Sequence, residues 1–285
     1  MSATTTSRRP ERSSSAVAVS PVSFPRVVRA EWIKLWSLRS TYWVIGATLL
    51  AMVLMALLMS FGASQAAQNP EFGAGPDGTM VLGLSYSMAQ LVVAVLGVLV
   101  ISGEYSTGMI RSSFAAVPGR VSVLAAKALV IAVVSFVLGV VGVGLSYLVS
   151  IPLLADAGGA ADLGDPDTQR MFWGTGLYLM AVALLALGVG ALLRHSAGAI
   201  ATVLGVLLVL PTVAQIAAAQ LDWVADLYPY LPSTAGERIV AFDLGAMAMG
   251  MPDNLLEPWA GFGVLMAYVA VVLVAATVFL RRRDA

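Results

Sequence analysis

Six long stretches of the chain contain no charged residue, and each is long enough to cross a lipid bilayer. They cover residues 40–70, 78–103, 128–155, 171–193, 196–221 and 258–280. A helix needs about 20 predominantly apolar residues to cross the hydrocarbon core of a membrane. Helices of soluble proteins keep a polar face toward water, and that face interrupts such runs. The sequence therefore predicts an all-α membrane protein with six transmembrane helices, at about 42–62, 80–102, 122–154, 171–193, 197–220 and 259–280.

The composition supports a membrane protein and excludes several kinds of site. Only 11% of the 285 residues are charged, against about 25% in average soluble domains. The formal net charge is zero, which gives no reason to expect nucleic-acid binding. The chain has no cysteine and one histidine, His195. Disulfides, thiol nucleophiles and histidine clusters are therefore excluded, and we expect no resident metal or cofactor.

The basic residues are distributed unevenly between the two sides of the predicted membrane. Of the sixteen Lys and Arg residues, only Arg170 and Arg238 fall in the three connections that would share one side. Basic residues near span ends are retained on the cytoplasmic side. The distribution predicts that both termini are cytoplasmic, with residues 103–120 and 281–285 on the same side and residues 222–258 outside.

The segment before the first span has two parts. Residues 1–24 are rich in Ser, Thr, Ala and Arg, and are predicted to be a disordered tail. Residues 25–40 place Val28, Trp32, Leu35 and Trp36 on one face of a helix. Basic, tryptophan-bearing amphipathic helices lie in the membrane interface. Residues 25–40 are therefore either an interfacial helix or an extension of the first span.

The chain lacks the residues that an autonomous pump or a membrane enzyme would need. No G-x-x-x-x-G-K-[ST] phosphate loop occurs, so ATP hydrolysis by this chain is not expected. No charged residue lies near the centre of a predicted span, and Lys127, close to one end of span three, can either reach the surface or pair with Glu104. His195 is expected to be a polar turn residue. Gly139, Gly142 and Gly144 indicate close helix approach.

Two segments carry a resemblance to a known family. Residues 29–41 read RAEWIKLWSLRST before span one, and residues 102–111 read SGEYSTGMIR after span two. With the six-span layout, they resemble a permease subunit of the type-2 ABC exporter family. The resemblance implies that residues 25–40 are an amphipathic elbow helix, with Trp32, Lys34, Leu35, Trp36 and Arg39. It also implies a separate ABC ATPase subunit that holds ATP and Mg, a second permease copy forming a homodimer, and a bacterial plasma membrane.

In that family the loop after span two carries a coupling helix that sits on the ATPase. Carried over by position, the coupling residues are Glu104, Tyr105, Ser106, Thr107, Gly108, Met109, Ile110, Arg111 and Phe114. Glu104 has three open interpretations. It pairs with Arg111 or Arg120 and stabilises the loop, it forms a salt bridge to the ATPase, or it is a solvated carboxylate at the end of a span.

Polar residues in two spans are candidates for substrate contact. Ser85, Tyr86 and Gln90 lie in span two, and Thr212 and Gln215 lie in span five, spans that line the central path in related exporters. The alternative is that they join packed helices. Outside, Thr234 to Glu237 has the pattern of a capping box that opens a short helix. Residues 239–251 are a candidate re-entrant helix, with a surface-lying loop as the alternative.

The leading functional hypothesis is a non-enzymatic permease subunit of an ATP-driven exporter. The apolar spans favour a hydrophobic or amphipathic substrate, as in multidrug or antibiotic efflux, or in lipid or peptide export. The alternative hypothesis is a membrane-embedded sensor, immunity or scaffold protein without transport activity of its own.

Overall fold

The computed structural model describes residues 23–69, 75–109, 119–155, 159–242 and 254–283. Within these ranges the regular structure is entirely helical, and six helical segments are long and apolar enough to span a membrane. The predicted all-α fold with six spans is therefore confirmed. The spans are α2 (Arg39–Gln68), α3 (Gly78–Ser106), α5 (Arg120–Leu154), α6 (Pro166–Leu193), a fifth segment that begins with α7 (Ser196–Leu204), and α11 (Pro258–Arg283).

Capping residues set where two of the spans begin. Asp77 precedes α3, and its carboxylate accepts a hydrogen bond of 2.7 Å from the backbone N–H of Met80. Asp165 precedes α6 and accepts one of 3.1 Å from the N–H of Thr168. These bonds satisfy backbone donors that the first helical turn leaves unpaired. As a result, α3 starts with its charge-free run at Gly78, and α6 starts at Pro166, before its run begins.

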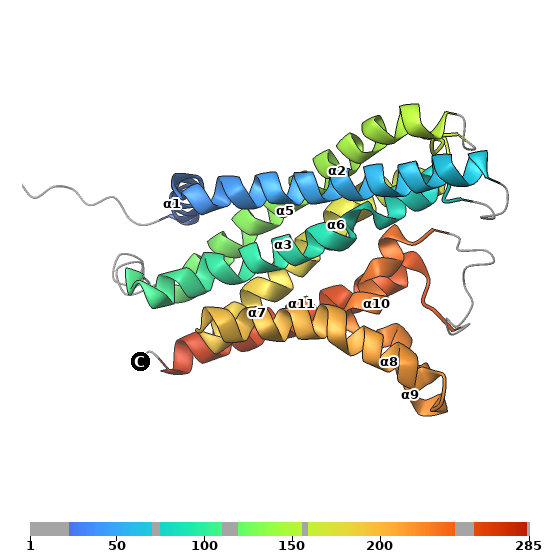
Figure 1. The fold of residues 1–285 in the computed structure, drawn as a ribbon. Helices are drawn as coiled ribbons and strands as arrows, with labels where there is room; N and C mark the ends of the chain where they lie inside the picture. The colour runs from blue at the N-terminus through green and yellow to red at the C-terminus, as the bar shows by residue number, and fades with distance from the viewer. Residues whose placement is uncertain (1–22, 70–74, 110–118, 156–158, 243–253, 284–285) are drawn as a thin grey trace, which may run out of the picture.

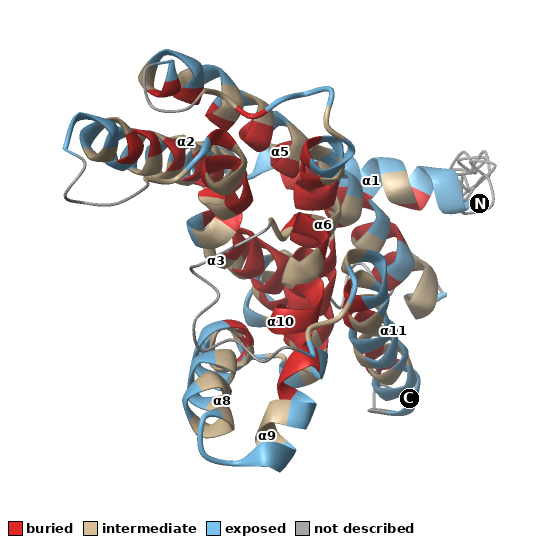
Figure 2. Ribbon diagram, turned by 90° about the vertical axis from the view of Figure 1, so that its right-hand side faces the viewer, coloured by how far each residue is buried: buried red, intermediate tan, exposed pale blue. Residues whose placement is uncertain are grey.

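The bundle is built around α6. This helix packs against α3, α5 and α11, and most of its side chains are buried (Figure 2). A Cβ added to Gly139 of α5 would lie 2.7 Å from the Cα of Gly176, so α5 and α6 approach closely there. The close approach predicted for Gly139 is confirmed, and Gly142 likewise faces the side chain of Met52. The same prediction for Gly144 is wrong, because nothing lies within 4 Å of its added Cβ.

A separate helix, α1 (Phe24–Ser37), precedes the first span. Pro25 occupies its first turn, and Leu38, with an extended backbone (φ −89°, ψ 126°), separates it from α2. Figures 1 and 2 show α1 lying across one end of the bundle, the end that also carries the C-terminus. We call this the terminal end and the opposite one the far end. Trp32 is 42% exposed on α1, and the placement of α1 in a membrane interface stays a prediction.

Short helices fill the far end between the fifth and sixth spans. They are α9 (Asp222–Leu227), η3 (Tyr228–Tyr230), α10 (Pro232–Glu237) and η4 (Arg238–Val240). The capping-box prediction is wrong, because α10 begins at Pro232 and its N-cap, Leu231, has no side chain that can accept a hydrogen bond. Of the candidate re-entrant segment, residues 243–251 lie outside the described residues.

The fifth span changes its helical repeat midway. After α7 comes a π-helical turn, η2 (Gly205–Val209), followed by α8 (Leu210–Ala218). Pro211 has no backbone N–H, so it cannot donate to the carbonyl four residues before it. The N–H of Leu210 donates to the oxygen of Gly205, five residues back, which is the hydrogen-bond pattern of a π-helix. The following helix, α8, buries none of its residues.

Candidate functional site

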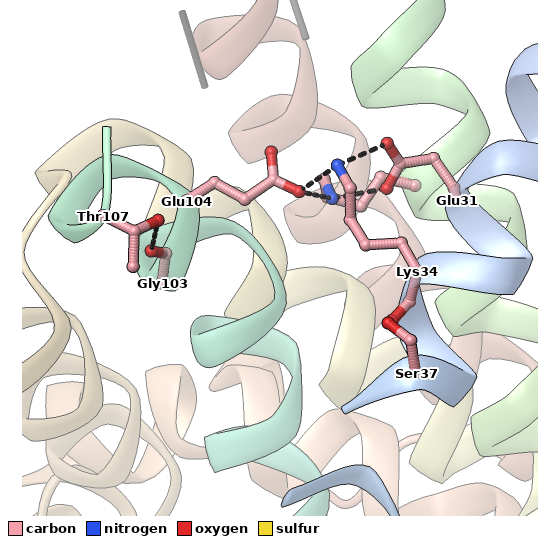
Figure 3. A network of polar contacts seen from close by, with 7 residues as sticks. Glu31, Lys34, Ser37, Gly103, Glu104 and Thr107 are labelled. Carbon is pink, nitrogen blue, oxygen red and sulfur yellow. Dashed lines mark hydrogen bonds and ion pairs between the residues drawn. The ribbon is translucent and has the colours of Figure 1, made fainter. Parts of the chain in front are cut away.

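A cluster of four charged side chains joins three helices at the terminal end (Figure 3). Glu31 and Lys34 come from α1, Glu104 from the last turn of α3, and Lys127 from the second turn of α5. Lys127 Nζ lies 2.6 Å from Glu31 Oε2 and 2.8 Å from Glu104 Oε1. Lys34 Nζ lies 2.6 Å from Glu104 Oε1 and 3.2 Å from Glu31 Oε1. We call these four residues the charge cluster.

The charge cluster is buried and electrically balanced. The side chains of Lys127, Glu104 and Glu31 are 2%, 5% and 7% exposed, and that of Lys34 is 25% exposed. Two ammonium groups face two carboxylates, so no net charge is buried. Removing a charge from water is costly unless a partner compensates it. The four groups therefore depend on one another.

The environment of Lys34 shows this mutual dependence. Burial alone lowers the pKa of Lys34, but the hydrogen bond to Glu104 and the attraction of Glu31 raise it, and the net shift is upward. The carboxylates therefore favour the charged form of Lys34. The second oxygen of Glu104, Oε2, is buried and has no hydrogen-bond partner among the described residues.

The sequence brings the cluster together through the packed face of α1. Val27, Glu31 and Leu35 recur every four residues, lie on one side of the helix, and are all buried. Lys34 follows Glu31 by three residues and therefore flanks the same face. The hydroxyl of Thr41 in α2 donates to the carbonyl of Leu35 at 2.6 Å, which ties the end of α1 to the first span. The packed face thus presents its one carboxylate directly to Lys127.

The structure excludes one of the three interpretations of Glu104. The predicted pairing of Lys127 with Glu104 is confirmed. The solvated interpretation is wrong, because Glu104 is buried. Among the described residues its ionic partners are Lys34 and Lys127. Arg111 and the side chain of Arg120 lie outside the described residues, so pairing of Glu104 with either of them, or with the ATPase, stays a prediction.

The end of α3 also contacts the turn between α6 and α7. The guanidinium of Arg194 lies over the ring of Tyr105, 5.1 Å from its centroid. The hydroxyl of Ser196 donates to that of Ser102 at 2.8 Å. His195 caps α7, its Nδ1 accepting from the N–H of Gly198 at 3.1 Å, so the predicted turn role is confirmed. The last turn of α3 is therefore held on one side by α1 and on the other by this turn.

The remaining residues of the predicted coupling region lie at or beyond the end of α3. The hydroxyls of Ser106 and Thr107 both donate to the carbonyl of Gly103, at 2.9 Å. Gly108 has a φ of 73°, which favours glycine and turns the chain away from the helix. Met109 is 41% exposed. Ile110, Arg111 and Phe114 lie outside the described residues, and the coupling role of the region stays a prediction.

The elbow residues differ in what they contact. Leu35 is buried and packs in the main core, whereas Arg39 is exposed at the start of α2. Trp36 is half-buried, and its ring lies 5.7 Å from the rings of both Trp32 and Tyr42. The three rings form one aromatic group on α1 and the start of α2.

The candidate substrate residues fall into two separate sets. On α3, Ser85 donates to the carbonyl of Leu82, and Gln90 accepts a hydrogen bond of 2.6 Å from the hydroxyl of Tyr178 on α6. Tyr86 packs edge-to-face against Tyr178, with ring centroids 5.1 Å apart. All three residues are buried, and Tyr86 and Gln90 contact α6 through Tyr178.

The α8 set lies on a different surface. Thr212 is exposed and donates to the carbonyl of Leu208 in its own helix, and Gln215 is half-buried. Among the described residues no hydrogen bond or ring contact joins this set to the α3 set. Their role in substrate contact stays a prediction.

The sequence did not lead us to predict the contacts of two carboxylates, those of Glu31 and Glu237. Glu31 carries a local signal, because it shares a four-residue spacing with Val27 and Leu35. Glu237, at the end of α10, lies 3.4 Å from the hydroxyl of Tyr178. Nothing in the sequence around Glu237 indicates that contact, which depends on how α10 packs against the spans.

Comparison with known proteins places these features in a family. A family model described as ABC-2 family transporter protein matches residues 27–212, from the packed face of α1 through four spans and into the fifth. No curated protein matches the chain. The match covers the charge cluster and well over half of the sequence. The chain therefore belongs to the ABC-2 transporter family, whose members are membrane-embedded permease components rather than enzymes.

Proposed function

We propose that the chain is the permease subunit of an ATP-driven ABC exporter in a bacterial plasma membrane, with both termini cytoplasmic. A separate ABC ATPase, which holds ATP and Mg, docks at the terminal end on residues 103–120. Family membership supports an ATPase partner in general. The observation that carries the proposal is the charge cluster, because it ties together the helices on either side of that docking segment.

The charge cluster would transmit a movement of the docking segment to the helices α1, α3 and α5. The segment between α3 and α5 is the stretch on which the ATPase would push. Glu104 ends the helix that enters this stretch, and Lys127 lies in the first turns of the helix that leaves it. Both are bound to α1 through Glu31 and Lys34. A displacement of the docking segment would therefore move α1, α3 and α5 as one unit.

The apolar surfaces support a proposal for the cargo and for the assembly. We propose a hydrophobic or amphipathic substrate, such as a drug, antibiotic, lipid or peptide. The fifth span exposes large apolar residues, among them Val209, Val213 and Ile216. Such a surface needs lipid or another apolar surface against it. A second copy of the chain, giving a homodimer with two ATPases, would supply it, with Thr212 and Gln215 beside the shared path.

The proposal is tested by replacing Glu104 with Ala in the chain co-expressed with its ATPase. We expect reduced copurification of the ATPase, or loss of the ATP hydrolysis that accompanies transport in reconstituted vesicles. Asp167→Asn is the matched control, because it removes a carboxylate from an exposed ion pair with Arg170 at the far end. Wild-type values of both quantities for the Glu104 variant would remove the cluster from the mechanism.

The alternative function is a sensor, immunity or scaffold protein without transport activity. It predicts that the purified chain, with or without an ATPase, moves no cargo across vesicle membranes. Mass spectrometry of the detergent-purified complex separates the two, because an exporter retains a nucleotide-binding subunit in fixed stoichiometry.

A further inference from the structure

A carboxyl group from the far-end segment reaches deep into the helix bundle. Glu237 is the last residue of α10, which packs against α11. Tyr178, which it contacts, is fully buried and lies twelve residues after the start of α6 at Pro166. At 1.5 Å per residue, this is about 18 Å along the helix. Glu237 therefore lies beside the middle of a span, although it belongs to none of the six.

Glu237, Tyr178 and Gln90 form a hydrogen-bonded group across three helices. The hydroxyl of Tyr178 lies 2.6 Å from Gln90 Oε1 and 3.4 Å from Glu237 Oε1. The side chain of Gln90 also hydrogen-bonds to the carboxyl of Glu237. A tyrosine hydroxyl carries one proton, so Tyr178 donates to only one of its two neighbours at a time.

The protonation state of Glu237 determines which of two hydrogen-bond arrangements forms. If the carboxyl is neutral, its own O–H donates to the oxygen of Tyr178, which donates to Gln90. If the carboxyl is ionised, it accepts from Tyr178, and the bond between Tyr178 and Gln90 is lost. The shorter distance to Gln90 is the one expected for the neutral carboxyl.

No cation pairs with Glu237 in the part of the chain that the structure describes. Its charge acts on Tyr86, Tyr178 and Tyr228. Arg238 follows it in the chain and lines the same cavity, and the charges of Arg170 and Glu257 act on Arg238. Arg238 donates from Nε to the carbonyl of Leu256 at 2.7 Å. Arg170 donates to the backbone carbonyls of residues 238, 239 and 241 and pairs with Asp167. The nearby guanidinium groups thus bind other acceptors.

A cavity adjoins the carboxyl of Glu237. Glu237 lines a cavity of about 160 Å³, together with Tyr86, Tyr228, Thr234 and Phe242. This volume is ample for several water molecules, and the cavity offers hydroxyl partners for them. Burial raises the pKa of Glu237 to about 7, although the hydrogen bonds from Tyr178 and Gln90 act in the opposite direction.

We propose that Glu237 is a proton-binding site inside the bundle, and that its protonation state decides whether Tyr178 donates to Gln90 or to Glu237. The proton enters and leaves through water in the cavity. Protonation therefore strengthens the connection between α3 and α6, and deprotonation transfers the tyrosine bond to α10. This inference stands on the contacts within one chain and needs neither a partner ATPase nor a cargo.

The test is a pH titration of the purified full-length chain in lipid nanodiscs, followed by infrared spectroscopy. A protonated carboxyl has a carbonyl stretching band that a carboxylate lacks. We expect wild type to show such a band that disappears with a midpoint near pH 7, and Glu237→Gln to lack it. Glu257→Gln is the matched control and should keep the band. A band that is unaffected by Glu237→Gln, or a midpoint near the ordinary glutamate value of 4.5, would overturn the proposal.

A second variant tests the hydrogen-bond arrangement itself. Tyr178→Phe removes a donor to the ionised carboxyl, so the midpoint of the Glu237 band should move to higher pH. The band assigned to Glu237 must still be present, which shows that the variant retains the folded site. An unchanged midpoint, or a downward shift, would show that Tyr178 does not share its proton with Glu237.

Discussion

Removal of Lys127 should destabilise the fold far more than removal of an exposed charge. Lys127→Met keeps the length of the side chain but leaves Glu31 and Glu104 facing only Lys34. Lys127 is 2% exposed and makes ionic contacts of 2.6 and 2.8 Å. Breaking a buried ion pair by removing one partner costs about 3–5 kcal/mol, because an uncompensated charge stays buried. We expect Glu104→Gln, which strands the two lysines in turn, to cost a similar amount.

The double variant decides whether the four groups act as one unit. Lys127→Met with Glu104→Gln removes one positive and one negative charge and leaves Glu31 paired with Lys34 at 3.2 Å. Its cost should fall below the sum of the two single costs by about 2–3 kcal/mol, the upper range for coupled contacts.

Unfolding on heating, followed by tryptophan fluorescence in nanodiscs, measures these differences. At about 2–4 °C per kcal/mol, the single variants should unfold roughly 10 °C below wild type. Asp167→Asn, whose carboxylate is 74% exposed, should lose less than about 1 kcal/mol. If Lys127→Met unfolds within 2 °C or so of wild type, or if the two single costs simply add, the cluster is not a mutually dependent unit.

Three further predictions concern other parts of the chain. Gly139→Ala should lower the unfolding temperature, because its Cβ would meet the backbone of α6. Gly144→Ala should raise the unfolding temperature slightly, since Ala favours a helix over Gly by about 0.5–1 kcal/mol. Equal shifts for the two variants would contradict the close packing of α5 on α6 at Gly139. Asp165→Ala should cost about 1 kcal/mol through loss of the cap on Thr168, read from the same thermal assay, and Asp165→Asn should retain most of the stability. Because the pKa of Glu237 is raised from 4.5 to about 7 in the folded state, the folded chain binds more protons between these values, and its stability should fall by at most about 3 kcal/mol as the pH rises through that window. Glu237→Gln should lack this fall, and a wild-type stability that rises over the window would have the wrong sign.

Local patterns in the sequence predict the helices but not all of their partners. The charge-free runs identify six spans because crossing a bilayer depends on length and apolarity within each segment. The pairing of Lys127 with Glu104 could also be predicted, since both lie near the same ends of consecutive spans. Glu31 was not anticipated as the third member, because its contact with Lys127 joins residues 96 positions apart.

The position of Glu237 is a feature that the sequence pattern does not predict. Its charge marks residues 222–258 as a connection, and the sequence accordingly predicts no ionisable group near a span centre. The structure brings it beside Tyr178 because α10 packs against α11 and leaves its last residue facing α6. Such a contact depends on the packing of several helices at once. Periodicity within one segment cannot predict it.

The π-helical turn η2 separates the fifth span into two α-helical segments, α7 and α8. Helix α7 packs into the bundle through Ala199 and Val203, which are buried, whereas α8 buries none of its residues. The carbonyl of Leu207, four residues before Pro211, has no α-helical donor, so the backbone is less constrained here than in an unbroken helix. A bend at this turn would move α8 and leave the buried contacts of α7 in place.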